Sequence, residues 1–289
     1  MTQIAFLGTG LLGAAMVEAA RKRGEDVAVW NRTIEKARAL EKVGARVAAT
    51  PADAVRGASR VHLVLTDDAV VEQVIADLRP GLSPEAIIID HSTTQPALTA
   101  ERAKRLNAGG IRYLHCPVFM GPAAAREQKG TVLAAGPRVL FDAVHSDLAR
   151  MGARVEYFGE RPDLAAVYKL IGNAFVVGIN ALVADVFAIG SGAGVASADA
   201  LRILEFFNPS GVIGARGRKM AERDYEPSWE LTMARKDVRL MIETADEFPL
   251  AALGGIAKRI DALIAEGRGS DDLAVIAKDS TRTEPTVRR

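Results

Sequence analysis

The chain has 289 residues, enough for one large domain or two, and its 49% apolar and 25% charged residues are typical of an ordinary soluble protein. The formal net charge of +1 gives no electrostatic footprint for a nucleic acid or a membrane surface, so we expect neither as a partner. A single cysteine, Cys116, excludes an internal disulfide and, with an N-terminus that leads straight into a strand pattern rather than a signal peptide, favours a cytoplasmic protein.

A glycine-rich turn follows the first strand pattern. Residues 3–7 form a short apolar run that fits a strand buried on both faces. The sequence Gly8-Thr9-Gly10-Leu11-Leu12-Gly13 comes next, and residues 14–23 form a helix pattern that stops at Gly24. A second strand pattern covers residues 27–30. Strand, glycines, helix and strand therefore occur in the order that a dinucleotide-binding unit requires.

Each glycine of this turn has a physical role. Gly8 permits the tight turn, Gly10 lets a pyrophosphate approach the backbone, and Gly13 lets the helix pack closely on the strand. The free N–H groups at the start of the helix then bind the phosphates. The alternative is a glycine turn in an α/β protein that binds no nucleotide.

The residues after the second strand indicate which dinucleotide binds. NAD sites place a carboxylate about 20 residues past the glycines, where it binds the ribose 2′-hydroxyl. This chain has Asn31-Arg32-Thr33 there instead. Arg32 can pair with a 2′-phosphate, and Asn31 and Thr33 can donate hydrogen bonds to it. We therefore predict NADP as the cofactor, against the alternative that Arg32 is only a solvated surface charge.

Strand and helix patterns alternate as far as residue 159, which predicts a mostly parallel, doubly wound sheet. Strands are expected at residues 3–7, 27–30, 47–49, 61–65, 86–89, 111–114, 131–135 and 154–158, and helices at 14–23, 34–43, from 51, 70–78, 97–108 and 139–151.

The pattern changes near residue 161, beyond which only helices are expected, at residues 164–189, 198–206, 212–223, 232–247, 249–267 and 270–277, before a polar, frayed tail over 278–289. We therefore predict an α/β domain over residues 1–161 and an all-helical domain over 162–289.

The first helix of the second domain is apolar on nearly all sides. It contains Asn173, Asn180 and Asp185, each expensive in hydrocarbon, so we interpret it as a buried helix rather than a membrane span. A helical domain of this size could cover it only in part, which predicts a homodimer.

Ligands of open parallel sheets bind beyond the carboxyl ends of the strands. After the glycines and Arg32, the corresponding positions are Leu65, Thr66 and Asp67, then Asp90 to Thr93, then Pro117 to Gly121. Ser92 offers a hydroxyl and Gly121 exposes a backbone N–H, so we expect both to bind the polar end of the substrate, and Thr93 offers a second hydroxyl. The alternative for residues 90–93 is a helix N-cap.

Lys169 and Asn173 are four residues apart on the long apolar helix, so they share one face. An ammonium group facing a nicotinamide could donate a proton to a carbonyl being reduced, and the amide could hold the same substrate. The alternative is a lysine that reaches solvent from the first turns of the helix. Lys236, next to Asp237, could reach the cofactor or form a surface ion pair.

Taken in order, these motifs resemble the β-hydroxyacid dehydrogenases, which include 3-hydroxyisobutyrate dehydrogenase and the glyoxylate/succinic semialdehyde reductases. The resemblance implies a Rossmann domain, an all-α domain and Lys169 as the catalytic group. It also implies that Leu65, Thr66, Thr93 and Lys236 lie near the cofactor. The small-molecule substrate would be an aldehyde or keto acid.

One segment departs from the family pattern. The family usually has Ser-Gly-Gly after Pro-Val, whereas this chain has Phe119-Met120-Gly121 and then Pro122. Together with Trp229 in place of a usual Phe, this predicts a pocket for a bulkier or less polar substrate. The alternatives are an imine reductase of related fold and a non-catalytic NADP-binding scaffold protein. Lys169 argues against both, because such relatives tend to replace it.

Overall fold

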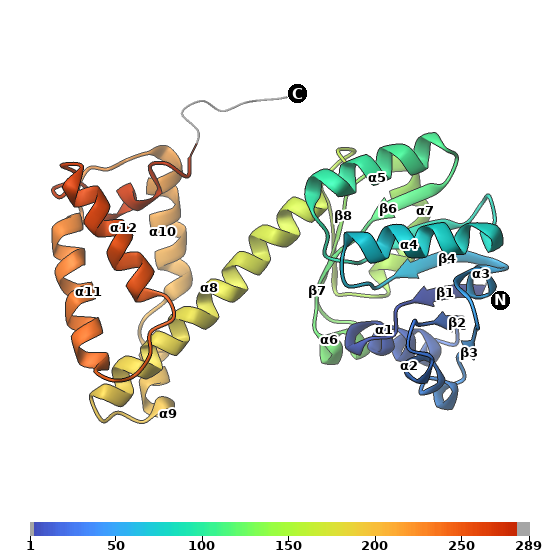
Figure 1. Cartoon of the computed structure of the whole chain (residues 1–289), viewed down its shortest axis with the longest axis horizontal. Coiled ribbons are helices and arrows are strands. Elements are labelled where there is room, and N and C mark those ends of the chain that lie inside the picture. The colour runs from blue at the N-terminus through green and yellow to red at the C-terminus, as the bar shows by residue number, and fades with distance from the viewer. Residues whose placement is uncertain (1–2, 282–289) are drawn as a thin grey trace. The chain divides into compact units, whose positions relative to one another are not determined.

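A computed structural model describes residues 3–281 of the chain (Figure 1). The chain forms two compact units, Met1–Asn173 and Ala174–Arg289. Helix α8 (Leu164–Gly192) contributes to both units. The units therefore divide inside α8, later in the chain than residue 161, where the sequence pattern changes. Residues 282–289, part of the predicted frayed tail, lie outside the described residues.

The first unit is built on a six-stranded sheet whose order is β3-β2-β1-β4-β5-β6. Every pairing in this sheet is parallel. Chain order reverses between β1 and β4, which creates the crevice where such sheets bind ligands. The strands are β1 (Gln3–Leu7), β2 (Asp26–Trp30), β3 (Arg46–Val47), β4 (Ala58–Leu63), β5 (Ile87–Asp90) and β6 (Arg112–His115).

Apolar clusters cover both faces of this sheet, which confirms the predicted doubly wound arrangement. On β1, Ile4 and Phe6 enter one cluster, whereas Ala5 and Leu7 enter the other. Helix α1 packs on the first face and α4 on the second. The helices and turns of this region are α1 (Leu11–Lys22), α2 (Ile34–Arg38), η1 (Glu41–Val43), α3 (Pro51–Val55), α4 (Asp68–Leu78), η2 (Arg79–Gly81) and α5 (Pro96–Ala108).

The remaining strands of the first unit form a separate sheet, which the sequence did not predict. Strand β7 (Val118–Phe119) pairs antiparallel with β8 (Thr131–Ala134), and β8 pairs parallel with β9 (Arg154–Tyr157). A single bridge between His115 and Ala135 links the two sheets. Helix α6 (Pro122–Arg126) follows β7, and α7 (Arg138–Ala149) follows β8.

The described part of the second unit is helical, as predicted. Its core contains Leu231, Ile260, Leu263 and Val275. Beyond the end of α8 the elements are α9 (Ser197–Ala200), η3 (Leu201–Glu205), α10 (Pro209–Glu222), α11 (Leu231–Ala245), α12 (Leu253–Ala265) and η4 (Leu273–Ala277).

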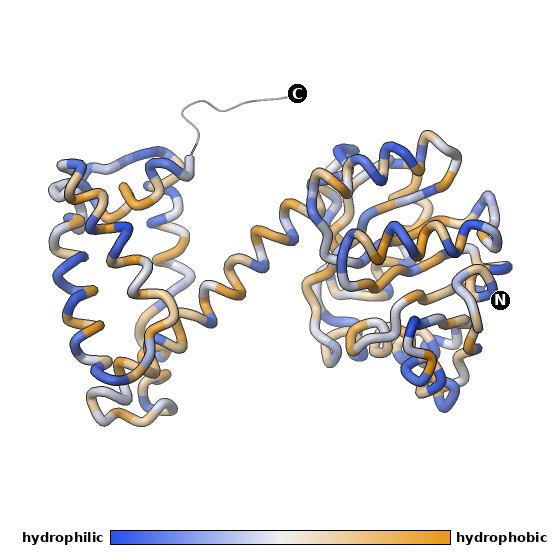
Figure 2. Tube along the Cα trace, in the orientation of Figure 1, coloured by the Kyte–Doolittle hydropathy of each residue, from blue (hydrophilic) through white to orange (hydrophobic). Residues whose placement is uncertain are grey.

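Helix α8 confirms the predicted long helix, but it is not buried within one chain. Phe175, Val176 and Val177 are 53%, 56% and 69% exposed, and Figure 2 shows hydrophobic residues along the helix. Among the described residues, only α8 has the length and composition that would suffice to cross a membrane, and 11% of its most apolar window is buried. The core helix of a soluble protein passes the same test of length and composition.

Candidate functional site

The glycine turn has the geometry that its residues predict. Gly8 has a φ of +100°, and a Cβ there would lie 2.2 Å from the carbonyl oxygen of Val64. A Cβ at Gly13 would lie 2.0 Å from the carbonyl oxygen of Gly8, whereas a Cβ at Gly10 would meet nothing within 4 Å. Gly10 is also the N-cap of α1 and provides no side-chain cap. The first backbone N–H groups of α1 are therefore available to an anion.

Asn31 links the end of β2 to the glycine turn. Its side-chain oxygen accepts a hydrogen bond from Thr9 N at 2.9 Å, and its amide donates to the carbonyl oxygen of Thr33 at 2.9 Å. The predicted role of Asn31 was direct donation to a phosphate. In this structure the amide braces the turn that would hold the cofactor.

A hollow of about 500 Å³ lies between the glycine turn, β2 and α4. Arg32 and Thr33 line it together with Gly8 and Gly10. Lys36 of α2 also lines this hollow, although the sequence analysis did not select it. Its signal was its position in the first turn of the helix that follows Arg32, because that turn begins close to the end of β2. Two cationic side chains therefore border one hollow, and Leu65 and Thr66 line its other side.

Asp67 is the N-cap of α4. Its carboxylate accepts hydrogen bonds from Val70 N at 3.0 Å and from the Thr66 hydroxyl at 3.0 Å. The bond from Val70 is the main cause that lowers the pKa of Asp67, and Thr66 and Arg32 lower it further. The ionised carboxylate thus fixes the start of α4 beside the hollow.

Ser92 joins two strand ends. It is 2% exposed, and its hydroxyl oxygen accepts a hydrogen bond from Leu65 N at 3.0 Å. Its own N–H donates to Asp90 Oδ1 at 2.9 Å. Thr93, in contrast, is exposed. The alternative that residues 90–93 cap the next helix is wrong, because Gln95 is the N-cap of α5.

Three histidines of the first unit, His62, His91 and His115, are buried, whereas His145 is exposed. His62 Nδ1 lies 3.0 Å from His91 Nε2, and His91 Nδ1 lies 2.7 Å from the carbonyl oxygen of Cys116. Burial lowers the pKa of His91 to about 4 and lowers those of His62 and His115 as well. Among residues 3–281, no group of His, Cys, Asp or Glu could hold a metal ion.

Lys169 extends from the start of α8 to the second sheet. Its Nζ donates a hydrogen bond to the carbonyl oxygen of Val118 at 2.8 Å and lies 4.4 Å from the centre of the Phe119 ring. Burial lowers the pKa of this ammonium group. Val118 follows β6 closely in the chain, so Lys169 is attached to a segment just beyond the carboxyl end of a strand.

Phe119 and Met120 pack in two different apolar clusters, although both were predicted to line one pocket. Phe119 packs with the cluster at the start of α8. Met120 packs against the main core, and its Cε would lie 3.3 Å from a Cβ at Gly152. Gly121 is the N-cap of α6 and is exposed. Of the predicted substrate residues in this segment, only Phe119 contacts Lys169.

Two further predicted residues, Trp229 and Lys236, lie in the second unit. Trp229 is 36% exposed, and the guanidinium of Arg216 lies 5.8 Å from the centre of its ring. Asp272 accepts a hydrogen bond from Trp229 N. Lys236 forms an ion pair with Asp237 at 2.7 Å. The predicted roles of Trp229 in binding the substrate and of Lys236 in reaching the cofactor stay predictions.

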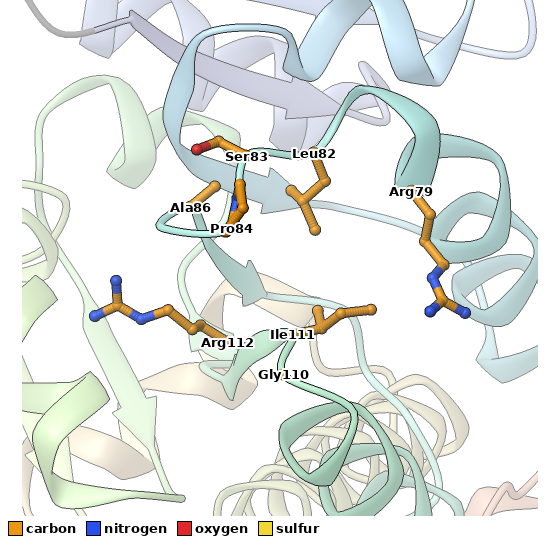
Figure 3. A pocket seen from close by; sticks show the side chains of 8 residues that line it. All are labelled: Arg79, Leu82, Ser83, Pro84, Ala86, Gly110, Ile111 and Arg112. Atoms are coloured by element: carbon orange, nitrogen blue, oxygen red, sulfur yellow. The ribbon is translucent and has the colours of Figure 1, made fainter.

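A second hollow, of about 250 Å³, lies at the amino ends of β5 and β6, away from the carboxyl ends (Figure 3). Arg79 and Arg112 extend from opposite sides of it and do not converge. Arg112 donates hydrogen bonds to Glu85 at 2.8 and 3.1 Å. This hollow therefore has no convergent polar group for a ligand.

The parallel sheet of switch-point order, with a glycine turn that opens onto a hollow, defines a dinucleotide-binding protein. Residues 3–159 match the model of the NAD binding domain of 6-phosphogluconate dehydrogenase. The chain belongs to the β-hydroxyacid dehydrogenase family, and residues 3–159 correspond to the NAD(P)-binding domain of that family.

Individual proteins extend this comparison. The chain is 28% identical over 270 residues to the cytokine-like nuclear factor N-PAC of Gallus gallus, covering 90% of this chain and 49% of that protein. It is 28% identical over 261 residues to glyoxylate/succinic semialdehyde reductase 1 of Arabidopsis thaliana, covering 86% and 89%. The chain thus spans about half the length of N-PAC.

Solved structures share the fold. An imine reductase from Pseudomonas sp. superposes with a TM-score of 0.86 at 22% identity, covering 96% of this chain and 99% of that one. Other neighbours are reductive aminases and imine reductases solved with NADPH, NADP⁺ or NAD⁺. At these identities the likeness shows the fold alone.

Proposed function

We propose that the protein is an NADP(H)-dependent reductase that transfers a hydride between the nicotinamide and a small aldehyde or keto acid. Lys169 carries this proposal. It is an ammonium group with a pKa lowered by burial, held at 2.8 Å by a backbone oxygen just beyond a strand end. Such a group can donate a proton to the carbonyl oxygen as hydride arrives at carbon, and can take it back in the reverse direction.

Arg32 and Lys36 support NADP over NAD. Both line the hollow beside the glycine turn, and no carboxylate stands at the end of β2. A 2′-phosphate would gain two cationic neighbours there, whereas a 2′-hydroxyl would lack the carboxylate that NAD sites place at the end of the second strand. Neighbours of the same fold have been solved with NADPH, and one with NAD⁺.

Asn173 is the proposed substrate-orienting residue. It lies one helical turn beyond Lys169 on α8, which places its amide on the same face. Thr93, which is exposed after β5, is proposed to lie against the nicotinamide half of the cofactor. Ser92 is proposed to hold the segment after β5 against Leu65, from which its hydroxyl accepts a hydrogen bond. The bound cofactor would supply the hydride.

An imine reductase is the second candidate, because the apolar Phe119 stands where the family usually has a serine hydroxyl. The neighbours named imine reductase have the same fold. Incubation of the purified protein with NADPH and a panel of aldehydes, keto acids and cyclic imines separates the two candidates by the loss of NADPH absorbance. We expect NADPH to be oxidised in the presence of aldehydes or keto acids. Oxidation with imines alone would favour the second candidate, and none with any member would favour a non-catalytic NADP-binding protein.

We further propose a cytoplasmic homodimer in which α8 is covered by the second copy. The free thiol of Cys116 is buried, in keeping with a reducing compartment. The exposed apolar residues of α8 provide the physical reason for association. We propose neither nucleic acid nor a membrane as a partner.

A further inference from the structure

Phe119 and Gly172 fit into one another at the start of α8. A Cβ at Gly172 would lie 2.2 Å from Phe119 Cζ and 2.7 and 3.0 Å from the two Cε atoms. The tip of the ring therefore occupies the space that any other residue at position 172 would need for its side chain. The ring thus rests on bare helix backbone, one turn from Lys169.

The Lys169 ammonium group is held at two points by one short strand. An ammonium group has three N–H donors and no acceptor. One donor is directed at the carbonyl oxygen of Val118, 2.8 Å away, and the ring of the next residue, Phe119, lies 4.4 Å away. A cation at this distance from an aromatic ring is attracted by the negative face of the ring. A donor remains that is bound to neither neighbour.

The Phe119 ring packs in a cluster of uncharged side chains. The cluster that includes Phe119 contains Leu133 and Ala135 from β8 and its end, Ala165 and Leu164 from α8, and Phe158 after β9. Tyr168, on α8, stacks on Phe158 at 4.1 Å. Burial is the cause that lowers the pKa of Lys169. The Phe119 ring opposes this effect, because its face favours the charged form.

We infer that Phe119 is the positioning residue of Lys169: its ring, seated on Gly172, fixes the ammonium group so that its remaining N–H points away from β7. This inference rests on the proposed function, because it concerns how the proton donor is aimed. Phe119 then acts through Lys169. The alternative is that the ring only fills space between β7 and α8.

Four variants of the full chain separate these roles. Phe119→Leu keeps apolar bulk and removes the ring face, whereas Phe119→Tyr keeps the face. Gly172→Ala displaces the ring, and it should fold because only the tip of a side chain must move. Gly254→Ala is the matched control for adding a methyl group to a helical glycine, because a Cβ there meets nothing within 4 Å.

The first readout is the titration of Lys169 itself. Each variant is labelled with an amine-reactive anhydride over a range of pH, and modification of Lys169 is followed by mass spectrometry. The midpoint of the labelling rate against pH reports the pKa of Lys169, and the rate at the high-pH plateau reports how easily the reagent reaches it. With Phe119→Leu and Gly172→Ala, the unprotonated fraction at a given pH should rise about two- to fivefold, because the charged form loses the ring face. Phe119→Tyr and Gly254→Ala should match the wild type.

The second readout is turnover. If Lys169 donates the proton, kcat falls at high pH as the ammonium deprotonates, and this limb should move to lower pH in Phe119→Leu and Gly172→Ala. KM for NADPH should not change. An unchanged labelling midpoint in both variants would show that the ring only fills space, and would overturn the inference. If either protein fails to fold, the other decides.

The two readouts also separate this inference from the proposed function. A shifted labelling midpoint together with wild-type turnover in Lys169→Ala would keep Phe119 as the positioning residue and remove Lys169 as the proton donor. An unshifted labelling midpoint together with a large loss of turnover in Lys169→Ala would keep Lys169 as the proton donor and remove Phe119 as its positioning residue.

Discussion

Among single residues, Lys169 should have the largest effect on turnover. We expect Lys169→Ala to lower kcat by about 10²- to 10⁴-fold, because that is the usual contribution of a positioned proton donor. NADPH affinity should stay nearly unchanged. Lys129→Ala is the control, since that lysine is exposed and pairs with Glu127. Steady-state rates and NADPH titration measure both effects, and a Lys169 variant with wild-type turnover would refute the role.

Arg32 should discriminate between the two nicotinamide cofactors. Arg32→Ala should lower the affinity for NADPH by about tenfold or more, because a charge-assisted contact with the 2′-phosphate is lost. The affinity for NADH should change much less. Fluorescence titration with each cofactor gives the comparison, and Arg38→Ala on the exposed side of α2 is the control. Equal losses for NADPH and NADH would contradict the assignment.

The site was predictable where its signals are local in sequence. The roles of Gly8 and Gly13 follow from their spacing, and the structure shows the two close approaches that those roles require. Lys36 was missed, although it lies in the first turn of the helix that follows Arg32. The hydrogen bond from Leu65 to the Ser92 hydroxyl could not be predicted from the sequence, because the two residues follow different strands.

Among the secondary-structure elements, α12 depends on a carboxylate from α8. Asp185 is 1% exposed and accepts backbone hydrogen bonds from Ala251, Ala252 and Leu253 at 2.5, 3.0 and 2.7 Å. It therefore satisfies the N–H groups at the start of α12, where Ala252, the N-cap residue, provides no side-chain cap. This contact explains why a strongly apolar helix carries an acid.

We expect Asp185→Ala to lower the free energy of unfolding by about 3 kcal/mol, because buried N–H groups lose their acceptor. Denaturant unfolding measures the change. Asp199→Ala removes an exposed acid from α9 and should change stability little. If both variants were equally stable, the contact would not contribute as described.

Elements with a strong local pattern were predicted well, whereas elements that depend on pairing were not. The long apolar helix α8 and the strands of the six-stranded sheet agree with the sequence to within a few residues. Strand β7 has two residues, too few for an alternation pattern, and it exists because β8 pairs with it. The predicted helix 34–43 divides into α2 and η1, and residues 270–277 form only the short 3₁₀ helix η4.

For the whole molecule, stability should depend on pH through its buried histidines. The pKa values of His62, His91 and His115 are lowered by burial, that of His91 to about 4, so the folded chain binds fewer protons than the unfolded chain. Their contribution is complete above the unfolded value of about 6.5 and is lost as pH falls below it.

The free energy of unfolding should therefore fall by up to about 1.4 kcal/mol per pH unit for each histidine below pH 6.5. Denaturant unfolding at several pH values tests this, and His62→Gln should reduce the slope. Equal stability on both sides of that pH would show that these rings titrate alike in the folded and unfolded chain.

The size of the molecule in solution tests the proposed homodimer. We expect sedimentation at micromolar concentration to give twice the mass of one chain. Val177→Glu should weaken the dimer because Val177 is 69% exposed on α8, whereas Val139→Glu, at a residue 70% exposed on α7, should not. A monomeric wild type would remove the proposal.

The fit between Phe119 and Gly172 has a consequence for how this protein can change. Any larger residue at 172 collides with the ring, whereas a small residue at 119 would leave a void above the bare helix backbone. The side chains that either position can accept therefore depend on the residue at the other. Directed evolution toward new substrates should therefore randomise both codons together, since a change at either position alters the space that the other side chain can use.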